Sequence, residues 1–374
     1  MAEKKNRTIV LMGAGSVLDF GAPKTEELTL ALLKHEDVGG INKDIFFLLE
    51  KNEVYADINF ESIIHFLDSL INYLRSDFKS GFKDIYQAFT FLDENFLKKL
   101  ELVDKIQFLE GGNQFREKHY RRAVKLLFFN YYKILMPQLT PYCDAWSVTH
   151  KKNKNLKNWY LKESEKSVLR IYTTNYDRLI PNLLSKSGIN VFDGFQYQSD
   201  YDYLSVKPDL FGILNKLDIA VHYNLHGSLY WSLAFNQIKY WKSNQTELYG
   251  ADSFQKNYSN SEPNHANFLI PVITGYAKLR KAQVSPIREF FNAFQKDLLL
   301  ADKIIIAGYS FSDDHINNLL STACLYNQNV QIEIVDYDEK GSNKNISKRL
   351  REKVKKMNQN KIIYHMKGFS QYLQ

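Results

Sequence analysis

The chain has few cysteines and no long hydrophobic run. Its 374 residues include two cysteines, Cys143 and Cys324, and no CxxC spacing. Two isolated thiols are typical of proteins kept in a reducing compartment, and they exclude a zinc module built on four cysteines. No apolar stretch approaches the roughly 20 residues that a membrane-spanning helix needs. The polar N-terminus, MAEKKNRT, lacks the features of a secretory signal. We therefore expect a cytoplasmic protein with no membrane contact and no bound metal.

A strong excess of one charge is also absent. Lys and Arg number 49 against 42 Asp and Glu, which gives a net charge of +7. Part of this excess lies in Ser347–Lys356 (SKRLREKVKK), which holds six basic residues and one Glu. Such a run can contact nucleic acid or an acidic partner. The solvated face of a surface helix is the favoured interpretation, because helices commonly carry such faces. We expect contact with nucleic acid only indirectly.

What the sequence does contain is a series of short apolar runs. Hydrophobic residues make up 44% of the chain, enough for a sizeable core. The first run, Thr8–Met12, ends at glycines, and helical periodicity follows over Lys24–Lys34. Further runs lie at Val168–Tyr172, Ile219–Asn224, Phe268–Ile273, Lys303–Ala307, Val330–Val335 and Lys361–His365. Strands separated by helices predict an α/β fold with a Rossmann-like parallel sheet.

The pattern changes between the first two runs. Phe60–Leu74 and Arg121–Leu139 place apolar residues three and four apart, with few strand or turn signals. We expect a helical subdomain over residues 41–166, inserted after the first strand–helix unit of a sheet domain that comprises residues 1–40 and 167–374. Ser243–Asn264 is rich in polar residues and predicts a long surface loop, either a lid or a tolerated insertion.

Two polar motifs and a glycine turn follow predicted strands. Gly13–Pro23 reads GAGSVLDFGAP and stands between a strand and a helix. Glycines there let backbone N–H groups approach a pyrophosphate at the helix N-terminus, although a plain strand–helix connection explains them equally. Thr173–Asp177 reads TTNYD. Asn175 offers a donor and an acceptor to ribose hydroxyls or to a water, whereas Asp177 fixes a hydroxyl or caps a helix.

A histidine and a second glycine turn complete the set. His226 lies in LHGS after a predicted strand, and histidine suits a general base near neutral pH, although a structural hydrogen bond is the commoner role. Gly308–Asp314 reads GYSFSDD, and its Gly308 and Ser310 are candidates to face phosphates or adenosine. Asp336 closes another strand, where an acidic residue binds ribose hydroxyls or simply forms a turn.

Taken in order, these elements resemble the sirtuin-like family over Thr8–Lys34 and Leu169–Leu373. The resemblance implies that Asn175 orients the nicotinamide ribose and a water, and that His226 is the catalytic histidine. It also implies a set of residues that contact NAD+. These are Gly13, Ala14, Gly15, Ser16, Pro23, Thr174, Asp177, Gly308, Ser310 and Asp336.

The details of the motifs indicate one branch of that family. The glycine loop continues as Pro23-Lys24-Thr25-Glu26-Glu27-Leu28, and the second glycine turn, which begins at Gly308, reads GYSFSDDHI. With TTNYD and LHGS, these look like bacterial sirtuin-like effectors of anti-phage defence. That resemblance implies an NAD+ hydrolase that releases nicotinamide and ADP-ribose and depletes NAD+ in abortive infection. The alternatives are a sensor that binds NAD+ or ADP-ribose, and an NAD-dependent protein deacylase.

The resemblance also implies how such an activity is held in check. Sirtuin-like effectors are controlled through oligomerisation or through a second protein, such as a HerA-type ATPase or a short Argonaute. The sequence shows a predicted catalytic domain and an insert, with no obvious separate sensor domain. We therefore expect a homo-oligomer and a partner that acts in trans.

Overall fold

The computed structural model of the chain describes most of the sheet region and part of the segment between its first two strands. The described residues are 5–36, 38–51, 58–73, 150–196, 207–228, 231–234, 237–240, 272–273, 278, 282–337, 343–354 and 362–374, with scattered positions from 124 to 144. None of the helices in these ranges is both long and apolar enough to cross a membrane.

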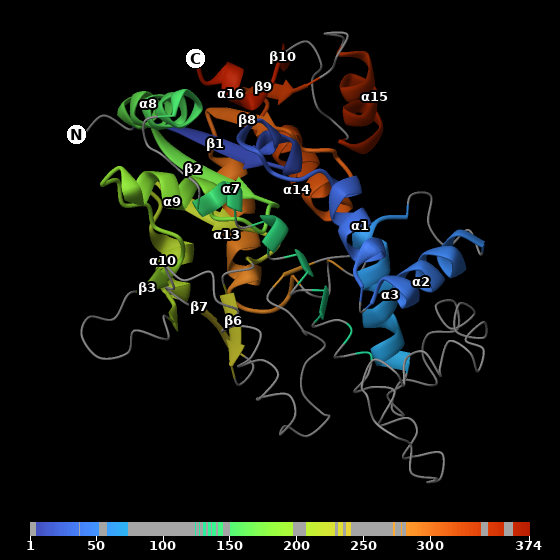
Figure 1. The fold of residues 1–374 in the computed structure, drawn as a ribbon. Helices are drawn as coiled ribbons and strands as arrows, with labels where there is room; N and C mark the ends of the chain where they lie inside the picture. Colours follow the sequence, from blue (N-terminus) through green and yellow to red (C-terminus); the bar gives the residue numbers. More distant parts are fainter. Residues whose placement is uncertain are drawn as a thin grey trace, which may run out of the picture.

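Six parallel strands form the central sheet, in the order β10-β9-β8-β1-β2-β5 (Figure 1). They are β1 (Asn6–Met12), β2 (Ser167–Thr173), β5 (Val221–Asn224), β8 (Lys303–Ala307), β9 (Gln331–Asp336) and β10 (Ile362–Met366). The predicted α/β, Rossmann-like class is confirmed. The chain order reverses between β1 and β8, and ligands of such sheets bind at the carboxyl ends of the strands at this reversal.

Alternate residues of β1 supply two separate cores. Val10 and Met12 belong to the apolar cluster on one face of the sheet, and Ile9 and Leu11 belong to the cluster on the other face. This follows from the strand period of two residues. Because both faces are covered, the strand is a continuous apolar run rather than an alternating one.

Helices cover both faces. One cluster includes residues of α1 (Thr25–Lys34), α2 (Gly39–Lys51), α3 (Phe60–Tyr73), α7 (Pro141–Asp144), α8 (Lys151–Lys166), α9 (Leu179–Lys186) and α16 (Phe369–Tyr372). The other includes residues of α10 (Leu210–Asn215), α13 (Ile287–Leu299), α14 (Asp314–Tyr326) and α15 (Lys344–Lys353). This arrangement places the loops that follow β1, β2, β5 and β8 at one edge of the sheet.

The segment between β1 and β2 carries helices, as its periodicity predicts. α3 covers all of Phe60–Leu74 but its last residue, which is not described. Within Arg121–Leu139 the described positions are helical, and most of the apolar ones, such as Val124 and Leu127, are buried. The division into a sheet domain and an inserted helical subdomain stays a prediction. The predicted loop over Ser243–Asn264 lies outside the described residues.

One predicted strand is placed differently. Of Phe268–Ile273 only the last two residues are described, and Val272 forms an antiparallel bridge with Gly227 rather than a rung of the parallel sheet. Two short antiparallel pairs were not predicted. They are β3 (Phe195–Gln196) with β4 (Lys207–Pro208), and β6 (Trp231–Ala234) with β7 (Gln237–Tyr240).

The basic run forms a surface helix over the part that is described. In α15, Ile346 and Leu350 are buried, whereas Lys348, Arg351 and Lys353 are exposed. An apolar stripe with basic residues on the opposite face is what the surface-helix interpretation predicts.

A buried cluster of charges ties the sheet to α13. This sheet charge cluster consists of Arg7, Arg170, Tyr172 and Asp297. Asp297 is fully buried and accepts hydrogen bonds from Arg170 Nε at 2.6 Å, from Arg7 and from the Tyr172 hydroxyl. Arg170 also donates from Nη1 to the carbonyl of Ile219 at 3.1 Å. Because these groups join β1, β2 and the approach to β5 to one helix, the cluster orients α13 on the sheet.

Candidate functional site

The two glycine turns meet where the chain order of the sheet reverses. Gly13, directly after β1, donates its N–H to the carbonyl of Ala307 at the end of β8, at 2.9 Å. Gly15 donates to the carbonyl of Gly308 at 3.0 Å, and Gly308 donates to the carbonyl of Val335 in β9 at 2.8 Å. The turns after β1 and β8 and the end of strand β9 are therefore one hydrogen-bonded unit.

Packing between these turns requires glycine. A Cβ on Gly13 would lie 2.5 Å from the Gly308 carbonyl oxygen, and a Cβ on Gly308 would lie 2.0 Å from the backbone nitrogen of Ser16. Gly308 also has a φ of +55°, in the left-handed region that side chains disfavour. The sequence predicts that these glycines face the phosphates or, for Gly308, the phosphates or adenosine, with a plain strand–helix connection as the alternative for the first turn. Contact between the turns also requires them.

The first turn leaves one backbone donor free. Ser16 is buried, and its N–H and its hydroxyl both donate to the carbonyl of Gly13, at 3.0 and 2.6 Å. Its predicted contact with NAD phosphates stays a prediction. Ala14 and Gly15 are exposed, and among the described residues the Ala14 N–H finds no acceptor. Pro23 is half-buried just before α1.

The TTNYD motif is fastened to the glycine turn. Thr174 donates its N–H to the carbonyl of Met12 at 2.9 Å. Asn175 is 8% exposed, and its Nδ2 donates to the carbonyl of Gly13 at 3.2 Å. Its Oδ1 accepts no hydrogen bond from the described residues. The amide of Asn175 is therefore held in place with one acceptor left over.

Asn224, which the sequence analysis did not single out, supports this loop. It ends β5, and its Nδ2 donates to the carbonyls of Asn175 and Asp177, at 2.9 and 3.2 Å. The only sequence signal for this role is a buried polar residue at the end of a strand.

Asp177 makes the contact that the capping interpretation predicts. It is buried, and its Oδ1 accepts from the N–H of Leu179, the first residue of α9, at 2.9 Å. Burial raises the pKa of this carboxyl above its usual value. Its predicted contact with NAD+ stays a prediction.

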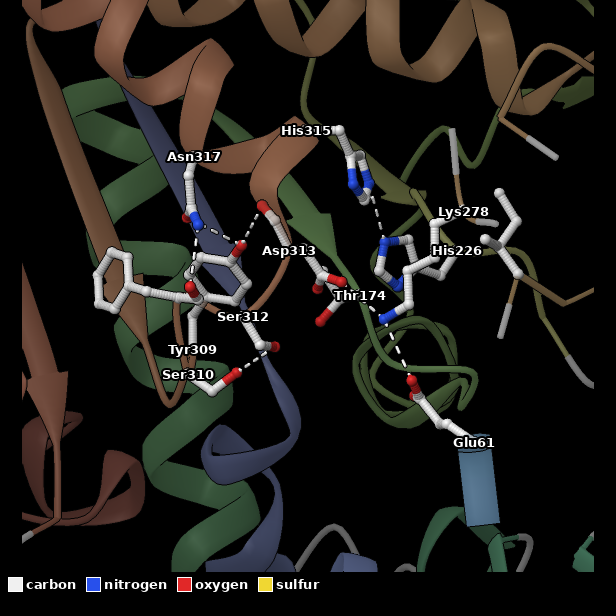
Figure 2. A network of polar contacts seen from close by, with 12 residues as sticks. Glu61, Thr174, His226, Lys278, Tyr309, Ser310, Ser312, Asp313, His315 and Asn317 are labelled. Atoms are coloured by element: carbon white, nitrogen blue, oxygen red, sulfur yellow. Dashed lines mark hydrogen bonds and ion pairs between the residues drawn. The ribbon is translucent and has the colours of Figure 1, made fainter. Parts of the chain in front are cut away.

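His226 lies just beyond β5 and is 2% exposed. Its Nε2 is 3.3 Å from Nε2 of His315, the second residue of α14 (Figure 2). Burial lowers the pKa of His226 to about 3, while the nearby Asp313 opposes that shift. The ring is therefore neutral at pH 7, with a lone pair on one of its two nitrogens.

Charged groups near this histidine form ion pairs that extend to α3. Lys278 Nζ lies 2.6 Å from Asp313 Oδ1 and 3.2 Å from Glu61 Oε2, as Figure 2 shows. Burial disfavours the Lys278 cation, but the two carboxylates outweigh this effect and raise the pKa of its ammonium. We call Glu61, Lys278, Asp313, His226 and His315 the site charge cluster.

Sequence reasoning missed four members of this cluster. Asp313 and His315 lie within the GYSFSDDHI motif, which carried a sequence signal. Glu61 and Lys278 are more than 200 residues apart and belong to no motif, so nothing in the sequence pairs them. Tyr176 of the TTNYD motif also reaches Glu61, with 3.1 Å between its hydroxyl and Oε1.

The second glycine turn presents two exposed hydroxyls. The Oγ atoms of Ser310 and Ser312 are 2.8 Å apart, and both residues are exposed. Behind them, Tyr309 and Phe311 are buried, and Asn317 Nδ2 donates to the Phe311 carbonyl at 2.9 Å. The turn is thus rigid beneath an accessible polar surface.

Asp336 lies at the same edge of the sheet, at the end of β9. It is half-buried, and its Oδ1 accepts from the N–H of Tyr337 at 2.9 Å. This is the bond expected of a turn residue. A role toward a ribose stays a prediction.

The structure brings most of the predicted residues to one edge. A hydrogen bond joins Asn175 to Gly13, and Leu225 donates to the carbonyl of Thr173 at 2.8 Å, which links the loop of His226 to the TTNYD loop. The loops after β1, β2, β5 and β8 therefore form one site. No described hydrogen bond joins Asn175 directly to His226.

A model of the SIR2-like domain family matches residues 169–354, from β2 through α15. The match supports a sirtuin-like family for this chain. SIR2-like domains bind NAD+ and are typically NAD-dependent enzymes. The matched segment holds the TTNYD, LHGS and GYSFSDDHI motifs, and β1 places the Gly13–Pro23 turn beside them. No curated protein matches the chain.

Proposed function

We propose that the protein is an NAD+ hydrolase that releases nicotinamide and ADP-ribose. The observation that carries this proposal is the placement of a neutral, buried His226 and an amide-anchored Asn175 in the loops after the neighbouring strands β5 and β2. Both loops end at the sheet edge that holds the glycine turns. A base and a polar orienting group at one edge of the sheet are what cleavage of a glycosidic bond by water requires.

The glycine turns fit the phosphates of NAD+. Ala14 is exposed and its N–H has no described acceptor, and the exposed residues Ser310 and Ser312 carry hydroxyls on the neighbouring turn. Backbone and hydroxyl donors of this kind bind phosphate oxygens. The pyrophosphate would then lie over the meeting point of β1 and β8.

Hydrolysis would divide the work between two side chains. Asn175 Oδ1 would accept a hydrogen bond from a ribose hydroxyl or from the attacking water. The bond between the nicotinamide nitrogen and the ribose C1′ breaks, and nicotinamide leaves with the electron pair. A water oxygen bonds to C1′, and His226 accepts the proton that is released. General-base help of this kind contributes about 10²–10⁴-fold.

Part of the segment between β1 and β2 borders this site. Glu61 of α3 contacts Lys278, and the Tyr176 hydroxyl lies 3.1 Å from both Glu61 Oε1 and the carbonyl of Ile273. We propose that α3 and the helices around it cover the reaction centre and exclude bulk water, which strengthens the electrostatic interactions inside it.

The biological role that we propose rests on the resemblance of the motifs to anti-phage effectors. Such a protein would deplete NAD+ in an infected cell and cause abortive infection. It would act as a homo-oligomer with a second defence protein, such as a HerA-type ATPase or a short Argonaute. Loss of cellular NAD+ on infection, in cells that carry the protein and in cells that carry Asn175→Ala, tests this role.

The enzymatic proposal is tested with purified protein and NAD+. We expect nicotinamide and ADP-ribose in equal amounts, and turnover in Asn175→Ala lowered by at least about 10²-fold, because the attacking water loses its orientation. Asn215→Ala is the matched control, since Asn215 also donates to a backbone carbonyl but is exposed on α10. Full turnover in Asn175→Ala would contradict the assignment. Tight NAD+ binding with no turnover would favour the sensor alternative.

A further inference from the structure

Two histidines share a hydrogen bond inside the site. The Nε2 atoms of His226 and His315 are 3.3 Å apart, and their ring centroids are separated by 5.4 Å (Figure 2). A hydrogen bond between two neutral imidazoles needs an N–H on one Nε2 and a lone pair on the other. The contact therefore couples the tautomers of the two rings.

His315 is held from several sides. It lies in the first turn of α14, and the ring of Phe291 from α13 packs edge-on against it at 5.2 Å between centroids. Asp313, Asp314 and Lys278 are close enough for their charges to act on the His315 ring. Lys278 is itself fixed by Asp313 and by Glu61 of α3. The imidazole of His315 thus has a defined position beside His226.

Only one direction of this hydrogen bond leaves His226 able to act as a base at its other nitrogen. If His226 donates from Nε2, its Nδ1 carries a lone pair that can accept a proton. If His226 accepts at Nε2 instead, its Nδ1 already carries a hydrogen and cannot accept another. Among the described residues, Nδ1 of His226 has no hydrogen-bond partner.

We propose that His315 is the positioning residue of the site: its Nε2 lone pair accepts the Nε2–H of His226 and so holds His226 in the tautomer whose Nδ1 is free to take a proton. This inference rests on the proposed function of His226 as a base. It follows the general arrangement in which a third group orients the base of a catalytic pair. The carboxylate of Asp313, anchored by Lys278, adds negative charge that favours the imidazolium formed on proton transfer.

The first test measures the tautomer and needs no turnover. In protein labelled with ¹⁵N-histidine, the ¹⁵N shifts of His226 at neutral pH report which ring nitrogen carries the hydrogen. We expect an Nε2–H in the wild type and in His315→Gln, whose side-chain oxygen also accepts. In His315→Phe we expect a mixture of both tautomers. A wild-type His226 with its hydrogen on Nδ1, or an unchanged tautomer in His315→Phe, would overturn the proposal.

The second test measures NAD+ hydrolysis by the same variants. We expect kcat of His315→Phe to fall by about 10²-fold, the low end of a general-base contribution, with KM unchanged. His315→Gln should recover most of this loss, which a purely space-filling role would not allow. His365→Phe is the control. His365 lies on the edge strand β10 and contacts Glu333 of β9, not His226. An unchanged kcat in folded His315→Phe would overturn the positioning role.

The two tests separate two failures. If the wild type has the expected tautomer but cleaves no NAD+, the proposed function fails, and the positioning of His226 by His315 stands. If the wild type cleaves NAD+ but His226 carries its hydrogen on Nδ1, the proposed function stands and the positioning role is wrong.

Discussion

Two clusters of charged groups lie on the same sheet and differ in where their members stand. In the sheet charge cluster, Asp297 is surrounded by two arginines and a tyrosine hydroxyl, all within β1, β2 and α13. In the site charge cluster, the charged groups lie in loops beyond the strand ends and on α3. Asp313 and Lys278 are close enough to His226, which is neutral, to act on its pKa. The groups of the first cluster are enclosed between the sheet and α13, whereas the second cluster lies next to exposed turns.

This difference shows that burial of charge alone does not identify a site. Asp297 is fully buried, as is Arg170, yet both are used in orienting α13. What distinguishes the second cluster is its position at the carboxyl ends of the strands, together with unused polar atoms nearby, the Ala14 N–H and Asn175 Oδ1. Four variants or conditions test whether one cluster serves stability and the other chemistry.

The largest expected effect is on the sheet charge cluster. Asp297→Ala leaves the fully buried guanidinium of Arg170 without its carboxylate and removes one of the two carboxylate partners of Arg7. Removing one partner of a buried ion pair costs about 3–5 kcal/mol. Urea unfolding should show a loss of this size. A loss below about 1 kcal/mol, the value typical of an exposed pair, would mean that the cluster does not hold the fold together.

The next effect concerns the glycine turns that join the two halves of the sheet. Gly308→Ala combines a left-handed backbone with a Cβ 2.0 Å from the Ser16 nitrogen. We expect a loss of at least about 1–3 kcal/mol, the usual cost of such strain, together with lost turnover. Gly40→Ala is the matched control, because a Cβ there meets nothing within 4 Å. Equal melting temperatures for the two variants would contradict the packing described for the turns.

A smaller loss of stability is expected in the site charge cluster. Lys278→Met leaves the carboxylates of Asp313 and Glu61 without their shared cation. An unpaired buried group costs about 1–3 kcal/mol, and Glu61 is partly exposed, so the loss should be smaller than in Asp297→Ala. Turnover should fall by a larger factor than in Asp297→Asn, a variant that keeps the shape of the sheet cluster. A larger loss of turnover in Asp297→Asn than in Lys278→Met would contradict the assignment of one cluster to stability and the other to chemistry.

The smallest effect is a pH dependence of stability. Burial lowers the pKa of His222 and of His226 to about 3, while a histidine in the unfolded chain has a pKa of about 6.5. The unfolded state therefore binds more protons below pH 6.5, and stability that is complete above this pH is lost as the pH falls. Each histidine should contribute about 1 kcal/mol between pH 6.5 and 5.5. Urea unfolding of His226→Gln at both pH values should show a shallower decline, and an unchanged decline would contradict the buried, neutral ring.

Much of the fold was predictable because buried parallel strands are continuous apolar runs. The predicted runs at Thr8–Met12 and Lys303–Ala307 lie within or coincide with β1 and β8. The order of strands in the sheet and the bridge of Val272 to Gly227 were not predictable, since periodicity shows which residues are buried but not which strand they pair with.

The candidate site divides in the same way. That Asn175 and His226 lie at one edge was predictable, because each follows an apolar run and polar residues at strand ends gather at one edge of a parallel sheet. Glu61 and Lys278 could not be found, because their pairing depends on how α3 packs against the sheet. The glycines were predicted for a phosphate, but contact between two turns distant in sequence also requires them.

The most direct test of the central claim is the release of nicotinamide and ADP-ribose from NAD+ by purified wild-type protein and His226→Ala. The account predicts turnover in the wild type and a loss of about 10²–10⁴-fold in His226→Ala. It predicts wild-type turnover in His365→Ala, because His365 lies on the edge strand β10, at the opposite edge of the sheet from β5. Turnover that survives in His226→Ala would show that the buried histidine is not the base, and the proposed reaction would lose its central residue.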